Sequence, residues 1–133
     1  MLTQDHLLRL CKARDQLRSV DQPSLDEVAK SAAMSRYHFI RQFKAVFGET
    51  PVQFRTRVRL ERAKQLLAHS SDSITAICMA VGFSSLGSFS ALFSRRFGRS
   101  PSAFRREMGR AGGLPTPGCL QILRAAWEHD SQI

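Results

Sequence analysis

The sequence predicts an all-α fold, and three observations support that prediction. Apolar residues recur at helical spacing along most of the chain, and no segment shows a clear strand pattern. Serine or threonine stands where most of these helical segments would begin, as expected of N-terminal caps. One helical pattern also occurs twice: seven residues of the first copy recur 50 positions later in the second copy. These residues are Phe39, Phe43, Phe47, Gly48, Pro51, Phe54 and Arg55 in the first copy, and Phe89, Phe93, Phe97, Gly98, Pro101, Phe104 and Arg105 in the second.

The first copy is preceded by a packing helix that we expect over residues 3–19. Ser24 and Glu27 have the spacing of a capping box, which predicts a short amphipathic helix directly after them. A tight turn follows at residues 33 and 34. Ser35 then caps a second helix, whose buried face carries the repeated phenylalanines.

A long helix should follow this pair. Gly48 is expected to end the second helix in the left-handed conformation, which glycine adopts without strain. Thr50 and Pro51 supply a cap and a favourable first position for the next helix, which continues to about residue 69. Its roughly 19 residues would span nearly 30 Å, at about 1.5 Å per residue.

The pattern then recurs in the same order. Ser73 begins a short helix, Gly82 marks the turn, and either Ser84 or Ser85 caps the second helix, which Gly98 closes. A last short helix begins at the following Ser-Pro pair. The glycine- and proline-rich stretch GRAGGLPTPG indicates a linker, and the apolar segment CLQILRAAWEH after it is compatible with either helix or strand. We therefore divide the chain into a first unit, a connecting helix, a second unit and a tail, at residues 1–49, 50–69, 70–108 and 109–133.

The charge distribution favours a polyanionic partner. The net charge of +9 is concentrated in two blocks, with +6 over residues 34–64 and +5 over residues 95–110. Arginine supplies 16 of the 20 basic residues, and its planar fork suits phosphate oxygens and guanine edges. Each block begins in or just after the second helix of one copy. Charge that served only solubility would not need to be concentrated in this way, so a polyanion-binding surface is favoured.

Other classes of protein are disfavoured by what the sequence contains. The three cysteines are far apart and odd in number, so a disulfide framework is not expected. The four histidines are scattered, so we expect neither a metal site nor a cofactor. The chain has no apolar run of roughly 18 residues and starts with a polar segment, so we expect no membrane contact and a cytoplasmic location.

Each copy has the order helix, tight turn, helix, which is typical of a helix-turn-helix unit whose second helix enters the major groove of DNA. The outward face of residues 35–47 suits this role, because an arginine can bind guanine with two hydrogen bonds and apolar groups can contact thymine methyls. The corresponding helix of the second copy carries mostly small residues. We predict base contacts for Tyr37, Ile40, Arg41, Leu86, Gly87, Ser90 and Ala91, and phosphate contacts for Arg36, Lys44, Ser88, Arg95 and Arg96.

Over about residues 3–108, the chain resembles the DNA-binding domain of the AraC/XylS transcription regulators. The resemblance is carried by SLDEVAKSAAMSRYHFIRQFKAVFGETPVQFRTRVRLERAKQLL and by ITAICMAVGFSSLGSFSALFSRRFGRSPSAFR, a long and irregular pattern. It implies seven helices, with two helix-turn-helix units joined by a long helix, and a role as activator or repressor. The chain is similar to the short members of the family that lack an effector-binding domain.

The predicted function is sequence-specific binding of double-stranded DNA in transcription regulation, with activation favoured over repression. We expect a monomer that reads two successive major grooves and has RNA polymerase as a protein partner. An enzymatic role is disfavoured, because no cysteine, histidine, serine or aspartate cluster indicates a nucleophile. Nonspecific or RNA binding is the third alternative, and the ratio of specific to nonspecific affinity at fixed salt distinguishes it.

Overall fold

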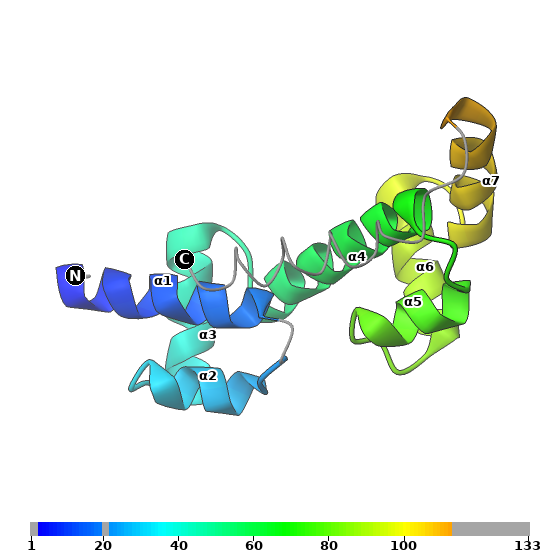
Figure 1. The fold of residues 1–133 in the computed structure, drawn as a ribbon. Coiled ribbons are helices and arrows are strands. Elements are labelled where there is room, and N and C mark those ends of the chain that lie inside the picture. Colours follow the sequence, from blue (N-terminus) through cyan, green and yellow to red (C-terminus); the bar gives the residue numbers. More distant parts are fainter. Residues whose placement is uncertain (1–2, 20–21, 113–133) are drawn as a thin grey trace. The chain divides into compact units, whose positions relative to one another are not determined.

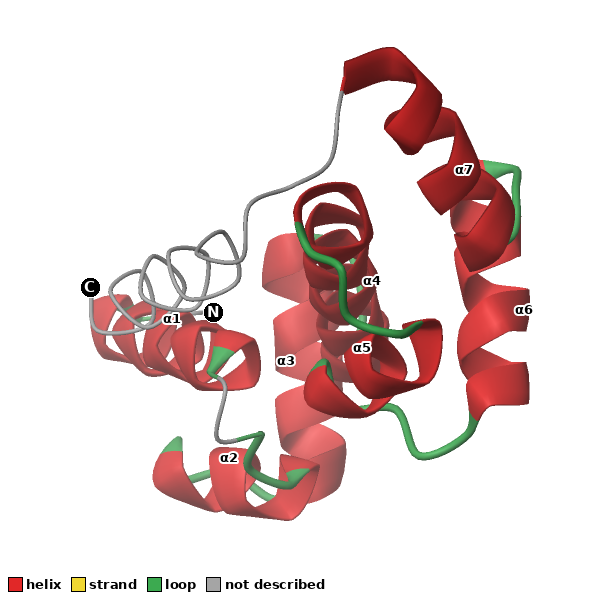
Figure 2. Ribbon diagram, turned by 45° about the vertical axis from the view of Figure 1, so that its right-hand side comes forward, coloured by secondary structure: helices red, strands yellow, loops and turns green. Residues whose placement is uncertain are grey.

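The computed structural model describes residues 3–19 and 22–112, which form seven helices (Figure 1). No strand is present in this described part of the chain (Figure 2). The predicted all-α fold, with two helix-turn-helix units and a long helix between them, is confirmed. The helices are α1 (Gln4–Arg18), α2 (Leu25–Ser31), α3 (Arg36–Phe47), α4 (Pro51–His69), α5 (Ile74–Ala80), α6 (Leu86–Phe97) and α7 (Pro101–Gly112).

The chain divides into two compact units, and the division falls between Arg57 and Val58, inside α4. In the first unit α2 packs against both α1 and α3, and in the second α6 packs against both α5 and α7. Each unit therefore holds one helix-turn-helix pair, α2 and α3 or α5 and α6, with its own buried core.

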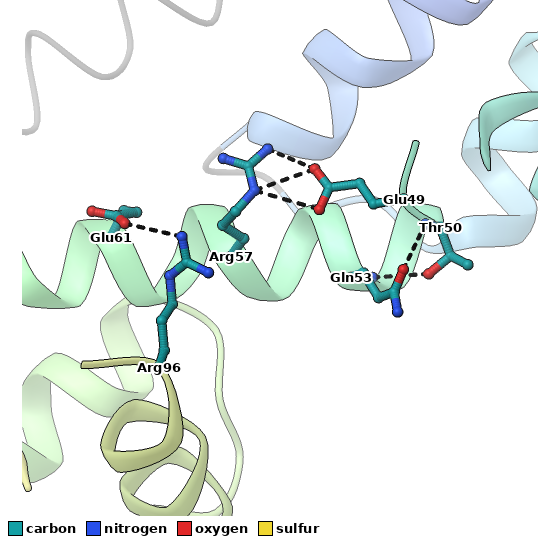
Figure 3. Close-up of polar contacts among 6 residues, drawn as sticks. All are labelled: Glu49, Thr50, Gln53, Arg57, Glu61 and Arg96. Carbon is teal, nitrogen blue, oxygen red and sulfur yellow. Dashed lines mark hydrogen bonds and ion pairs between the residues drawn. The ribbon is translucent and has the colours of Figure 1, made fainter. Parts of the chain in front are cut away.

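Side-chain caps begin the helices where the sequence places them. Ser24 and Glu27 form the predicted capping box at the start of α2. Thr50 and Gln53 form a second one at α4, where the Thr50 N–H donates to Gln53 Oε1 at 2.9 Å and the Gln53 N–H donates to Thr50 Oγ1 at 3.2 Å (Figure 3). Of the two serines left open before α6, Ser85 is the cap, since its hydroxyl accepts the backbone N–H three residues later.

A cluster of phenylalanines forms the centre of each unit, and the two clusters have nearly the same geometry. Phe43 and Phe93 are fully buried at the centres of these clusters. Ring centroids lie 5.7, 4.6 and 5.7 Å from Phe43 for Phe39, Phe47 and Phe54, and 5.8, 4.6 and 5.8 Å from Phe93 for Phe89, Phe97 and Phe104. The repeated phenylalanines are therefore core residues that hold the second helix of each pair on the body of its unit.

The turns within the two helix pairs have the same hydrogen bonding but different residues at the left-handed position. The Met34 N–H donates to the Ala29 carbonyl in the first turn, and the Phe83 N–H donates to the Cys78 carbonyl in the second, both at 3.0 Å. Gly82 occupies the position in the second unit with a φ of 107°, whereas Ala33 occupies it in the first with a φ of 58°. Because a Cβ is unfavourable in this region, the first turn is strained and the second is not.

Exchanging these two residues should therefore change stability in opposite directions. Ala33→Gly should raise the free energy of unfolding by about 0.5–1 kcal/mol, since the relieved strain exceeds the added entropy of glycine in the unfolded chain. Gly82→Ala should lower it by about 1 kcal/mol. Urea unfolding followed by circular dichroism measures both changes, and a destabilising Ala33→Gly would show that the turn is unstrained.

The last helix is longer than the sequence predicts. The sequence predicts a linker from Gly109, but α7 continues to Gly112. A Cβ at Gly109 would meet no atom within 4 Å, so the residue is a helical glycine on an open surface. One glycine weakens a helix by about 1 kcal/mol relative to alanine and does not by itself end it. The predicted linker beyond Gly112 and the apolar tail lie outside the described residues.

Candidate nucleic-acid interface

The predicted contact residues of the first unit gather on one face of α3. Ile40 and Arg41 lie three and four residues after Tyr37, and Lys44 lies four and three residues after them, which places the four residues on the same side of a helix. Tyr37 is 71% exposed, Arg41 and Lys44 are exposed, and Ile40 is partly buried. The face therefore presents an aromatic ring, an apolar group and two cations together.

Arg41 and Tyr37 also contact each other. The guanidinium carbon of Arg41 lies 5.6 Å from the centroid of the Tyr37 ring, within the range of a cation–π contact. This contact restrains the arginine side chain beside the aromatic ring. Arg36, one residue before Tyr37, instead lies beside Asp26 of α2, with 3.7 Å between nitrogen and oxygen.

The predicted contact residues of the second unit lie on α6 and form a different kind of surface. Leu86 is 44% exposed at the start of the helix, Gly87 and Ala91 are exposed, and Ser90 is partly buried. Ser88 is exposed, and its backbone N–H donates to Ser85 Oγ at 3.2 Å. The Ser88 backbone N–H is therefore already used by the Ser85 cap. The side-chain hydroxyl of Ser88 is the group that could contact a phosphate.

The two arginines near the end of α6 have different surroundings. Arg95 is exposed. Arg96 forms an ion pair with Glu61 of α4, with 3.3 Å between Nη2 and Oε1 (Figure 3). Its guanidinium carbon also lies 5.7 Å from the centroid of the Phe97 ring. Arg95 is therefore the better placed of the two for a phosphate, because Arg96 already has a carboxylate partner.

Some of the basic residues counted in the charge blocks have structural roles. Arg57 pairs with Glu49, with 2.6 Å between Nη2 and Oε1 (Figure 3). Arg55 donates to the carbonyl of Pro23, just before α2. Arg105 donates from Nη1 to the carbonyl of Asp72 at 2.5 Å and from Nη2 to that of Ser70 at 3.2 Å. These three arginines therefore have partners within the fold, and the charge of the two blocks is not all directed at a polyanion.

Arg55 and Arg105 occupy equivalent positions in the two copies, and burial lowers the pKa of both guanidinium groups. For Arg105 the nearby charge of Asp72 acts in the opposite direction. Each residue ties the helix that follows a helix-turn-helix pair to the segment just before that pair. The signal for this role was present in the sequence, because both arginines belong to the repeated pattern.

The described part of the chain contains two of the three cysteines, Cys11 and Cys78. Cys78 is buried, and burial raises the pKa of its thiol, which makes a thiolate nucleophile less available. Cys11 is partly buried on α1. Residues 3–19 and 22–112 contain no group of three or more histidine, cysteine, aspartate or glutamate side chains that could hold a metal ion. No helix in these ranges is long and apolar enough to cross a membrane.

Comparison with known proteins assigns a family to this arrangement. A family model described as a helix-turn-helix domain matches residues 28–107. The MmsAB operon regulatory protein of Pseudomonas aeruginosa is 37% identical over 89 residues, which are 67% of this chain and 29% of that protein. The transcriptional activator RhaS of Escherichia fergusonii is 41% identical over 91 residues, which are 68% of this chain and 32% of that protein. The aligned region thus spans about a third of these relatives.

Solved structures show the same fold. A transcriptional regulator of Chromobacterium violaceum with an AraC-type DNA-binding domain has a TM-score of 0.70 at 31% identity, covering 80% of this chain and 96% of that one. The DNA-binding domain of AdpA, solved in complex with a target DNA, has a TM-score of 0.69 at 27% identity, covering 83% and 97%. The repeat of two helix-turn-helix pairs, the family match over residues 28–107 and these relatives lead to one assignment: the chain belongs to the AraC/XylS family of DNA-binding transcription regulators.

Proposed function

We propose that this chain binds double-stranded DNA as a monomer and activates transcription from a bipartite site, with RNA polymerase as its protein partner. The observation that carries the DNA-binding part is the exposed face of α3, where Tyr37, Arg41 and Lys44 stand together. Activation is supported by the similarity to RhaS, a protein named as a transcriptional activator.

We further propose that α3 and α6 are the two recognition helices and enter successive major grooves. The support is the length of α4, whose 19 residues correspond to about 28 Å at about 1.5 Å per residue. One turn of DNA is about 34 Å long, so the connection is of the right order for neighbouring grooves on one face. The functional division at residues 1–49, 50–69 and 70–108 is part of this proposal.

The two proposed recognition helices supply both base contacts and phosphate contacts. Tyr37, Ile40 and Arg41 read bases in one half-site, and Lys44 binds a phosphate beside it. Leu86, Gly87, Ser90 and Ala91 face the bases of the other half-site, and Ser88 and Arg95 contact its backbone. Arg36 and Arg96 would have to leave the carboxylates of Asp26 and Glu61 to bind phosphates. Their contributions to the affinity for DNA should therefore be smaller.

Selection of binding sites from random duplex DNA, followed by footprinting, tests the bipartite site. Two protected half-sites about ten base pairs apart, on one face of the duplex, are expected. The mass of the complex should correspond to one protein chain per site. Half-sites on opposite faces, or a requirement for two chains, would exclude the monomeric arrangement. Equal affinity for all duplexes and for RNA at fixed salt would exclude specific recognition altogether.

Arg41→Ala should lower the affinity for the selected site by about 1–3 kcal/mol and relax the preference at one or two base pairs, because a guanine would lose both hydrogen bonds. Lys44→Ala is the matched control on the same face. It should weaken all sequences alike and reduce the salt dependence of binding. Affinities for the selected site and its single-base variants at several salt concentrations measure both effects. A uniform loss across sequences in Arg41→Ala would assign this residue to the backbone.

A further inference from the structure

The two proposed recognition helices share their buried faces but differ in their outward faces. Because α3 and α6 correspond at a separation of 50 residues, each outward position of one has a counterpart in the other. Large or charged side chains in α3 are replaced by small or apolar groups in α6. The pairs are Arg36 and Leu86, Tyr37 and Gly87, Ile40 and Ser90, Arg41 and Ala91, and Lys44 and Ser94.

This difference decides which features of a base pair α6 can recognise. A guanine is read by a side chain with two donors, and an adenine by an amide side chain. None of these five positions of α6 holds either kind of side chain. The thymine C5-methyl is the apolar group of the major groove, and it suits contact with Leu86 and Ala91.

Gly87 is not required by the fold. It lies in the first turn of α6 with helical backbone, and a Cβ there would meet only Ser85 Oγ, at an ordinary contact distance of 3.8 Å. Glycine is less favourable than alanine within a helix, and no packing contact at this position requires the absence of a side chain. A surface without a side chain at this point allows another molecule to approach the helix backbone closely.

We propose that α6 reads thymine methyl groups, with Leu86 and Ala91 as the contacting side chains and Gly87 as the residue that lets the first turn approach the base pairs. The inference rests on the proposed function, since it requires that α6 enters the major groove. Arg95, four residues after Ala91 and exposed, holds the phosphate backbone beside this face. The half-site of α6 is therefore rich in A·T pairs and defined by methyl groups, whereas the half-site of α3 contains a guanine.

Chemically altered duplexes test the inference on the full chain. In the selected site, each thymine is replaced in turn by deoxyuridine, which lacks only the methyl group. Each contacted methyl in the α6 half-site should then reduce affinity about fourfold, the factor that corresponds to ~0.8 kcal/mol for one buried methyl group. Replacing each guanine by 7-deazaguanine, which lacks the N7 acceptor, should weaken binding only in the α3 half-site.

Gly87→Ala provides an independent test on the protein. This variant should be as stable as or more stable than the unaltered chain, yet bind the selected site at least tenfold more weakly. Gly109→Ala is the matched control, because it also adds a Cβ to an exposed helical glycine. It should raise stability and leave affinity unchanged.

The outcomes separate this inference from the proposed function. A selected site that tolerates deoxyuridine at every position, or a Gly87→Ala variant with unchanged affinity, overturns the inference alone. Failure to select any sequence overturns the proposed function and the inference with it.

Discussion

Phe93→Ala should lower the free energy of unfolding of the second unit by about 3–5 kcal/mol, which is the range for truncating a fully buried phenylalanine. Phe93 has no exposed surface, and its ring is surrounded by those of Phe89, Phe97 and Phe104. Small domains have a total stability of about 5–15 kcal/mol, so the loss is a large fraction of it. Urea unfolding followed by circular dichroism should show an earlier transition for the helices of this unit.

Phe97→Ala is the matched control for this substitution. Phe97 belongs to the same cluster but is only partly buried, and the cations of Lys64 and Arg96 lie 5.1 and 5.7 Å from its ring centroid. Its truncation removes less buried apolar surface, so a loss of about 1–2 kcal/mol is expected. Equal losses in the two variants would contradict the assignment of Phe93 to the centre of the core.

Arg105→Ala should lower the free energy of unfolding by about 2–4 kcal/mol, although the substitution removes a charge from a strongly basic chain. The guanidinium group donates to the backbone carbonyls of Leu67, Ser70 and Asp72, at 3.4, 3.2 and 2.5 Å. Hydrogen bonds from charged donors contribute about 1.5–3 kcal/mol, and partly buried carbonyls left without a donor add to the loss. Thermal unfolding of the full chain measures the effect.

Two further variants isolate the cause. Arg106→Ala removes the same charge from the next residue, which is exposed, and should change stability by less than about 0.5 kcal/mol. Arg105→Lys keeps the charge but cannot direct three donors at three carbonyls, so most of the loss should remain. Full stability of Arg105→Lys would mean that the charge matters and the geometry of the fork does not.

The local structure was predictable because its causes lie within a few residues of one another. A serine or threonine three residues before its partner amide fixes where a helix starts, as at Ser35 and Ser73. Glycine at the left-handed position fixes where one ends, as at Gly48 and Gly98. The repeat of the phenylalanines identified the two cores, since equal patterns bury equal faces.

Three other features could not be assigned from the local sequence alone. Ser84 and Ser85 are both suitable caps, and only the course of the chain before α6 selects Ser85. Ala33 adopts a positive φ although alanine has no local preference for it, and only its place opposite Gly82 in the repeat indicates this conformation. The helix α7 continues through Gly109 because the local cost of one glycine, about 1 kcal/mol, does not end a helix.

The sequence by itself determined the all-α class, the two helix-turn-helix units and the outward face of α3, because helical periodicity and caps depend on neighbouring residues. Only the tertiary structure identified which groups the arginines contact. Arg96 pairs with Glu61 at a separation of 35 residues, and Arg105 reaches carbonyls 33 to 38 residues away. Such contacts join residues that are far apart in the sequence and that only the tertiary fold brings together. A count of charges along the sequence therefore cannot distinguish an arginine that stabilises the fold from one that is available to DNA.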